Sequence, residues 1–320
     1  MRKLVESVPN VSEGVRLDVV DRLAAAVAAV PGVNLLDRTS DASHNRSVLT
    51  LAGEAPAVLE ALERLVEGAI AEIDMTTQSG EHPRIGAVDV VPFVPLGGTT
   101  MAECVELANR FGARVAERFD LPVYLYAEAA TRPDRVRLAD VRRGEYEGLR
   151  REIATPGRRP DFGPARLHPR AGAVAVGARP FLIAWNVNLA SRDVQLADAI
   201  ARRIRESSGG FPKVQGKGFW IEELGVAQVS MNLLDFAVTP VWRVWEAIGE
   251  AAREAGVEPL ESELIGLMPL AAFLDVADRA GAPATDPVEA RLAAAAAFLK
   301  LRDFDPLMAL ELRLAAAERG

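Results

Sequence analysis

The chain of 320 residues has little cysteine and no long apolar run. Its single cysteine, Cys104, cannot form a disulfide within the chain, and its place on the apolar face of an expected helix predicts buried packing rather than redox chemistry. No stretch of about 18 apolar residues is present that could span a bilayer, and the first residues lack the apolar core of a signal peptide. We therefore expect a cytoplasmic protein that does not bind membranes.

Positive charge is neither dominant nor clustered. The chain has 37 lysines and arginines against 45 acidic residues, and its net charge is -8. Binding to nucleic acid requires a cationic face, which this scattered pattern does not provide, so nucleic acid is excluded as a partner. A content of 49% hydrophobic and 26% charged residues is typical of a globular enzyme, and the length allows two domains.

Several common site motifs are also absent. No Gly-x-Gly-x-x-Gly follows an expected strand, and no phosphate-binding Gly-Lys-Ser/Thr loop is present. The three histidines, His44, His82 and His168, are far apart in sequence, so no zinc pattern is present and no metal is predicted. Ser79 lies three positions before His82, which is only a weak signal for a serine nucleophile.

The most informative segment is Gly-Glu-His-Pro-Arg at residues 80–84, which leads into an apolar strand expected at Val88 to Val94. Pro83 holds the preceding His82 in extended backbone, so His82 is expected in a loop. Histidine takes and gives a proton near neutral pH, which makes His82 a candidate general acid/base. We expect Glu81 to raise its pKa, and we expect arginines such as Arg46 and Arg84 to hold substrate carboxylates. A loop histidine with a purely structural role is the alternative.

Hydrophobic periodicity predicts the same order of elements, strand, helix, strand, strand, helix, strand, in both halves of the chain. In the first half these are expected at 3–8, 15–30, 33–36, 47–52, 56–73 and 88–94, followed by a helix from Thr100, with a capping box at Thr100 and Glu103, and a strand at 123–127. In the second half they are expected at 181–189, 192–205 (capped by Ser191), 218–222, 225–236, 240–255 and 263–267. The order predicts an α+β protein of two ferredoxin-like two-layer sandwich subdomains.

We place the subdomains at residues 1–178 and 179–283, with a helical tail at 284–320. Residues 155–180 are rich in proline, glycine and arginine, which is compatible with a linker and with a rigid loop that lines a ligand site. Asn186 and Asn188 lie on the polar face of an alternating strand. That face is either solvated or able to hydrogen-bond the edge of a heterocycle.

The chain resembles the glutamate formimidoyltransferases, including the transferase part of the bifunctional formimidoyltransferase-cyclodeaminase. The resemblance extends from residue 5 to about residue 280 and rests on the segments VPNVSEG, DASHNRSV, IDMTTQSGEHPRIGAVDVVPFVPL, LPVYLYAEAA, RRPDFGP, GARPFLIAWNVNLAS, KVQGKGFW and AQVSMNLLDF. It implies transfer of the formimino group from N-formimino-L-glutamate to N5 of tetrahydrofolate, a co-substrate, in histidine degradation. It also implies a homodimer. The residues after position 280 are too few for the deaminase domain.

The resemblance also implies roles for particular residues. His82 is the expected catalytic residue. Substrate-binding residues are expected among Asn45, Arg46, Glu81, Arg84, Asn186 and Asn188. The folate-binding segment is expected to comprise Gly163, Pro164, Ala165, Arg166, Leu167, His168, Pro169, Arg170, Ala171 and Gly172, which is more basic here than in the animal members. A formyl donor, N-formylglutamate or 5-formyltetrahydrofolate, is the alternative on the same site.

Overall fold

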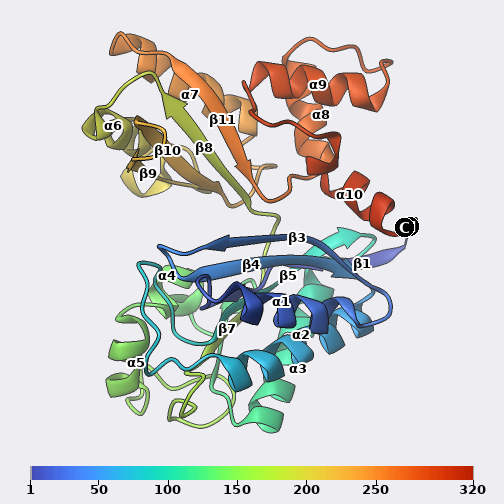
Figure 1. Ribbon diagram of the computed structural model, residues 1–320, viewed down its shortest axis with the longest axis vertical. Coiled ribbons are helices and arrows are strands. Elements are labelled where there is room, and N and C mark those ends of the chain that lie inside the picture. Colours follow the sequence, from blue (N-terminus) through green and yellow to red (C-terminus); the bar gives the residue numbers. More distant parts are fainter. Residues whose placement is uncertain (1, 320) are drawn as a thin grey trace. The chain divides into compact units, whose positions relative to one another are not determined.

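Two separate β-sheets organise the chain, which the computed structural model describes for residues 2–319 (Figure 1). The sheets belong to two units that divide after Pro180, and each unit has its own hydrophobic core. The predicted mixture of helices and strands is confirmed in both units. No helix within residues 2–319 is long and apolar enough to cross a membrane.

The first unit contains seven strands and five α-helices among its described residues. The strands are β1 (Lys3–Ser7), β2 (Asn10–Val11), β3 (Val33–Asp41), β4 (Arg46–Gly53), β5 (Val88–Gly97), β6 (Val123–Ala127) and β7 (Val174–Ala178). The helices are α1 (Leu17–Ala28), α2 (Ala55–Glu72), α3 (Met101–Phe119), α4 (Leu138–Val141) and α5 (Glu145–Glu152), with a 3-10 turn at Pro133–Arg135. The helices α1, α2 and α3 correspond to the periodic segments of the sequence.

The sheet of the first unit joins an antiparallel part to a parallel part. The strands β3, β4, β1 and β5 pair antiparallel in that order, whereas β7 pairs parallel with both β5 and β6. The strand β7 was not predicted, because it is short and follows a segment rich in proline and glycine. Residues 155–180 are therefore not a linker alone, since their last part is an inner strand of this sheet.

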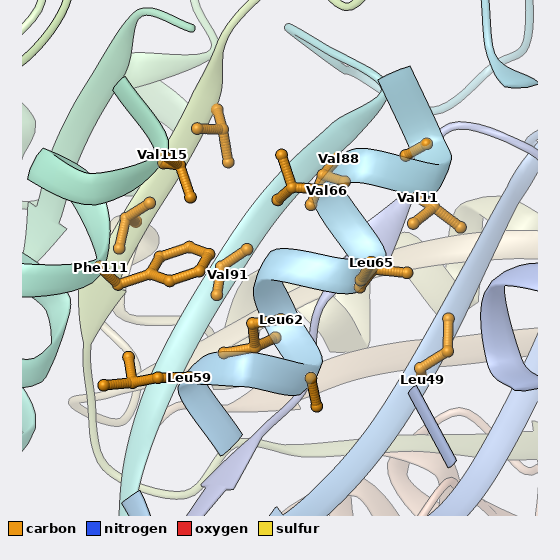
Figure 2. Close-up of a cluster of buried hydrophobic side chains, with 14 of the residues drawn as sticks. Val11, Leu49, Leu59, Leu62, Leu65, Val66, Val88, Val91, Phe111 and Val115 are labelled. Carbon is orange, nitrogen blue, oxygen red and sulfur yellow. The ribbon is translucent and has the colours of Figure 1, made fainter. Parts of the chain in front are cut away.

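The core of this unit lies between its sheet and the helices α2 and α3. Figure 2 shows Leu62 and Val66 of α2 beside Val91 of β5 and Phe111 of α3, and all four side chains are fully buried. Burial of each such side chain contributes about 1.5 to 3 kcal/mol. Cys104 is also fully buried, as predicted, and burial raises the pKa of its thiol to about 12.

The helix α3 begins with the predicted capping box. The Thr100 hydroxyl accepts a hydrogen bond from the Glu103 backbone N–H at 3.2 Å, and the Glu103 carboxylate accepts from the Thr100 N–H at 2.8 Å. Two of the backbone donors that a helix start leaves without partners are thereby satisfied.

The second unit has an antiparallel sheet in the order β11, β8, β10, β9. Its strands are β8 (Ile183–Leu189), β9 (Val214–Ile221), β10 (Val226–Leu233) and β11 (Pro259–Ile265). Its helices are α6 (Val194–Ile204), α7 (Val241–Glu254), α8 (Leu270–Arg279), α9 (Val288–Phe298) and α10 (Leu310–Ala317), with 3-10 turns at Glu206–Ser208 and Pro306–Met308. The helix α8 was not predicted.

The cap of α6 differs from the prediction. Asp193, not Ser191, is the N-cap, and its carboxylate accepts hydrogen bonds from the backbone N–H groups of Gln195 at 2.8 Å and Leu196 at 3.2 Å. Ser191 instead accepts from the Asp193 N–H at 3.0 Å. A carboxylate also interacts more favourably than a hydroxyl with the positive end of the helix dipole.

Candidate functional site

His82 lies in an irregular segment between α2 and β5, as predicted, and this segment is held against the turn between β3 and β4. The side-chain amide of Asn45 donates to the Ser79 carbonyl at 2.7 Å, and the Glu81 N–H donates to the Ser43 carbonyl at 3.3 Å. A Cβ atom at Gly80 would lie 2.4 Å from the His44 carbonyl oxygen, so only glycine allows this approach. The two segments therefore form one surface around His82.

The other side of the same segment is bonded to the expected folate-binding loop. The Ala87 N–H donates to the Ala171 carbonyl at 2.9 Å, and the Ala173 N–H donates to the Ile85 carbonyl at 3.0 Å. These bonds pair the end of the loop at residues 163–172 with the chain a few positions after His82.

Two glycines make this pairing possible. A Cβ atom at Gly86 would lie 1.9 Å from the Ala173 carbonyl oxygen, which no side chain tolerates. Gly172 has φ of +72°, and a Cβ atom there would lie 2.4 Å from the Ile85 carbonyl oxygen. Within the loop, His168 and Gly172 exchange backbone hydrogen bonds of 3.0 and 3.2 Å, which closes a tight turn.

The imidazole of His82 is half-buried among cationic side chains. Its ring centroid lies 6.4 Å from that of His44, in an edge-to-face arrangement. Burial, followed by the charges of Arg46, Arg142 and His44, lowers the pKa of His82 to about 2, and only Asp41 acts in the opposite direction. His82 is therefore neutral at physiological pH.

This direction corrects the expected effect of Glu81. The Glu81 side chain is exposed and is not among the groups that shift the pKa of His82. The groups that do shift the pKa of His82 come from the end of β3, from the turn that follows it, from β4 and from the end of α4, all of them remote in sequence.

Arg46 and Arg142 differ in how their charges are balanced. Arg142 forms an ion pair with Asp89, which is buried and also accepts from the Ile85 N–H at 2.7 Å. Nε of Arg46 is buried and has no hydrogen-bond partner among residues 2–319; Nε of Arg142 also lacks a partner there, but Nη2 of Arg142 pairs with Asp89. Burial and the charge of Arg142 lower the pKa of Arg46, so this guanidinium lies where a further anion would be favoured.

Arg84, by contrast, is engaged in the structure of the first unit. Its guanidinium is buried and forms ion pairs with Glu145 at 3.0 Å and Glu147 at 2.8 Å, and its Nε donates to the Gln78 side chain at 2.8 Å. These bonds raise the pKa of Arg84 and fasten the His82 segment to α5.

The charged side chains of the 163–172 loop are largely exposed. Arg166 forms an ion pair with Asp120, and Arg170 lies 3.6 Å from Asp74. The Nδ1 atom of His168 accepts from the Ala171 N–H at 3.0 Å, and burial lowers its pKa. His168 is therefore neutral and closes the turn.

Asn186 and Asn188 lie in the second unit on the sheet face opposite its core, as the alternation predicted. The Asn186 amide donates to Glu263 at 3.2 Å, and the Asn188 amide donates to Glu261 at 2.9 Å. Arg302 forms ion pairs with both glutamates. This face is a connected polar network within the second unit.

Sequence reasoning missed four members of the His82 surroundings, namely Asp41, His44, Asp89 and Arg142. The spacing of Asp41 and His44 in one turn was a usable signal. No local pattern marks Arg142 or Asp89, because the residues that explain them are remote in sequence. In residues 2–319 there is no group of three or more histidine, cysteine, aspartate or glutamate side chains that could hold a metal ion.

A neutral imidazole beside a cation without a hydrogen-bond partner at Nε defines a site for acid–base chemistry on an anionic substrate. The model of the formiminotransferase domain, N-terminal subdomain, matches residues 4–179, and the model of the formiminotransferase domain matches residues 184–280. The chain therefore belongs to the formiminotransferase family, as its motifs predicted, and it is a transferase.

Similar proteins agree with this assignment. The chain is 45% identical over 278 residues to the glutamate formimidoyltransferase of Streptococcus pyogenes serotype M1, covering 87% of this chain and 93% of that protein. It is 45% identical over 276 residues to the glutamate formimidoyltransferase of Thermoplasma acidophilum, covering 86% of this chain and 91% of that protein. It is also 45% identical over 283 residues to the formimidoyltransferase-cyclodeaminase of Mus musculus, covering 87% of this chain but 52% of that protein.

Proposed function

We propose that the protein transfers the formimino group of N-formimino-L-glutamate to N5 of tetrahydrofolate, giving L-glutamate and 5-formiminotetrahydrofolate. The observation that carries the proposal is the neutral His82 in a chain that is 45% identical to two glutamate formimidoyltransferases over more than nine-tenths of their length. Tetrahydrofolate is a co-substrate in this reaction, and the chain's own residues handle the protons.

The chemistry requires one proton to move between two nitrogens. N5 forms a bond to the amidinium carbon and then loses its proton, and the bond from that carbon to the glutamate nitrogen breaks as this nitrogen gains a proton. A neutral His82 accepts the first proton. Once charged, it lies next to Arg46 and Arg142, which makes it a ready donor to the departing nitrogen.

The anionic end of the substrate is assigned to Arg46, with Arg142 beside it. Arg46 has a buried Nε without a hydrogen-bond partner among the described residues, whereas Arg84 is occupied by Glu145 and Glu147. A carboxylate of formiminoglutamate would supply the missing acceptor. Asn45 takes part by holding the segment of Ser79 in place.

Folate is assigned to residues 163–172. Support comes from the hydrogen bonds that join the end of this loop to residues 85–87, because they keep the loop near His82. The substrate contacts of Asn186 and Asn188 stay a prediction.

We further infer that each unit is a ferredoxin-like sandwich and that the protein is a cytoplasmic homodimer. The first inference is supported by the shared pattern of both sheets, in which the first and third strands of the β-α-β-β-α-β order are neighbours. The homodimer and the compartment are expectations from the family resemblance and the composition.

The deciding experiment is turnover by purified protein with tetrahydrofolate and N-formimino-L-glutamate, in wild type and in His82→Ala. The variant is expected to lose about two to four orders of magnitude in kcat, because a positioned acid/base contributes about that much, while it still binds tetrahydrofolate. Glu117→Gln, an exposed position on α3, is the control. Near wild-type turnover in His82→Ala would contradict the proposed mechanism. A faster reaction of the wild type with N-formylglutamate than with N-formimino-L-glutamate would contradict the proposed identity of the donor.

A further inference from the structure

The proposed reaction requires more protons at the glutamate nitrogen than N5 supplies. The formimino carbon belongs to an amidinium group both before and after transfer, so its charge does not change. The glutamate nitrogen needs one proton to depart as an amine and a second to become the ammonium group of free glutamate at neutral pH. N5 provides the first through His82, and the second comes from water.

A path for that second proton is visible at His44. Its side chain is 41% exposed, and its ring lies edge to face with the half-buried ring of His82, with 6.4 Å between the centroids and 65° between the planes. At this separation two imidazole nitrogens can exchange a proton directly or through one water molecule. His44 is thus open to solvent and close to the residue that serves the substrate.

Asp41 fixes which nitrogen of His44 is available. Its carboxylate lies 2.7 Å from Nδ1 of His44, and its other oxygen accepts from the His44 backbone N–H at 2.9 Å. A carboxylate at Nδ1 keeps the proton on that nitrogen and leaves Nε2 as the exchanging atom. Asp41 is itself 46% exposed, so the pair is positioned without being sealed from water.

We propose that His44 is a proton-relay residue, oriented by Asp41, that carries protons between solvent and His82 in each catalytic cycle. This role rests on the proposed function, because it is the formimino transfer that consumes the proton. The charged groups that act on His82 are Arg46, Arg142, His44 and Asp41. The two arginines favour onward release of a proton from His82, and Asp41 holds His44 in place by two hydrogen bonds.

The first test is His44→Ala assayed with both substrates saturating. We expect kcat to fall by about 10- to 100-fold, at the lower end of acid–base contributions, with both KM values unchanged. Added imidazole, as a small mobile proton carrier, should restore kcat in proportion to its concentration while leaving wild type unaffected. Asp41→Asn should show a smaller loss with the same response to imidazole.

The second test is the double variant His44→Ala/His82→Ala. If His44 acts only through His82, the double variant has the same turnover as His82→Ala, because a relay without its acceptor contributes nothing. Circular dichroism and thermal unfolding verify that each variant is folded.

The outcomes separate the relay from the proposed function. A wild type without turnover on formiminoglutamate and tetrahydrofolate refutes the function. With an active wild type, the relay alone is refuted by unchanged kcat in His44→Ala, by a loss that imidazole does not restore, or by losses that multiply in the double variant.

Discussion

Replacing His82 by glutamine is expected to make the protein less sensitive to acid. The folded protein holds the pKa of His82 at about 2 instead of 6.5, whereas the unfolded chain returns it to its ordinary value. Below pH 6.5 the unfolded state therefore binds a proton that the folded state does not bind. Stability is unaffected by this residue above that pH and falls as the pH is lowered through it.

The size of the effect follows from linkage. One proton bound only by the unfolded state changes the free energy of unfolding by about 1.4 kcal/mol per pH unit, which gives about 2 kcal/mol between pH 7 and pH 5. His82 is half-buried, and solvent screening reduces the expected difference to about 1 to 2 kcal/mol. Glutamine is similar in size and does not ionise, so it removes the titration with little change in packing.

Urea unfolding of wild type and His82→Gln at pH 7 and pH 5 measures this difference directly. Other titrating groups are present in both proteins and cancel in the comparison. His168→Gln is the matched control, and it should show a smaller effect in the same direction, because burial lowers the pKa of His168 as well. Equal losses of stability in wild type and His82→Gln would show that burial and the charges of Arg46 and Arg142 do not keep His82 neutral.

The remaining predictions concern the two substrates. Arg46→Gln is expected to raise the KM for formiminoglutamate by about 10- to 100-fold, which corresponds to the loss of one charge-assisted hydrogen bond, with little change in the affinity for tetrahydrofolate. Steady-state kinetics with each substrate varied separately measures both values. An unchanged KM for formiminoglutamate would exclude Arg46 from the carboxylate site. Arg166→Ala and Arg170→Ala should each lower the affinity for tetrahydrofolate by about threefold, the value of an exposed ion pair, and leave the affinity for formiminoglutamate unchanged. Calorimetric titration of the folate decides that case, since equal affinities in variant and wild type would exclude these side chains from its site.

Patterns of short range in the sequence predicted much of the fold. The helices α1, α2 and α3 have apolar residues at helical spacing, and the capping box at Thr100 is a signal of four residues. The strand β7 was missed because five small and apolar residues after a proline-rich segment carry no alternation. Its place in the sheet depends on β5 and β6, which are remote in sequence.

The local structure around His82 was predicted in part. Pro83 restricts His82 to a loop, as observed, while the catalytic role of His82 and the folate-binding role of residues 163–172 stay predictions. The direction of the pKa shift at His82 could not be predicted from the sequence. Glu81 is adjacent in sequence but its side chain is exposed, whereas Arg142, which does act on His82, is sixty positions away. Electrostatic neighbours are set by tertiary packing, which no local pattern records.

The position of β7 has a consequence for biosynthesis. This strand is the last of the first unit to leave the ribosome, yet it lies between β5 and β6, and the residues just before it bond to the chain beside His82. A nascent chain that ends before Ala178 lacks the strand that bridges β5 to β6. Domains fold as units during synthesis, and contacts between remote residues form slowly. The chain around His82 is therefore held by the complete sheet of the first unit only after residue 178 has been translated.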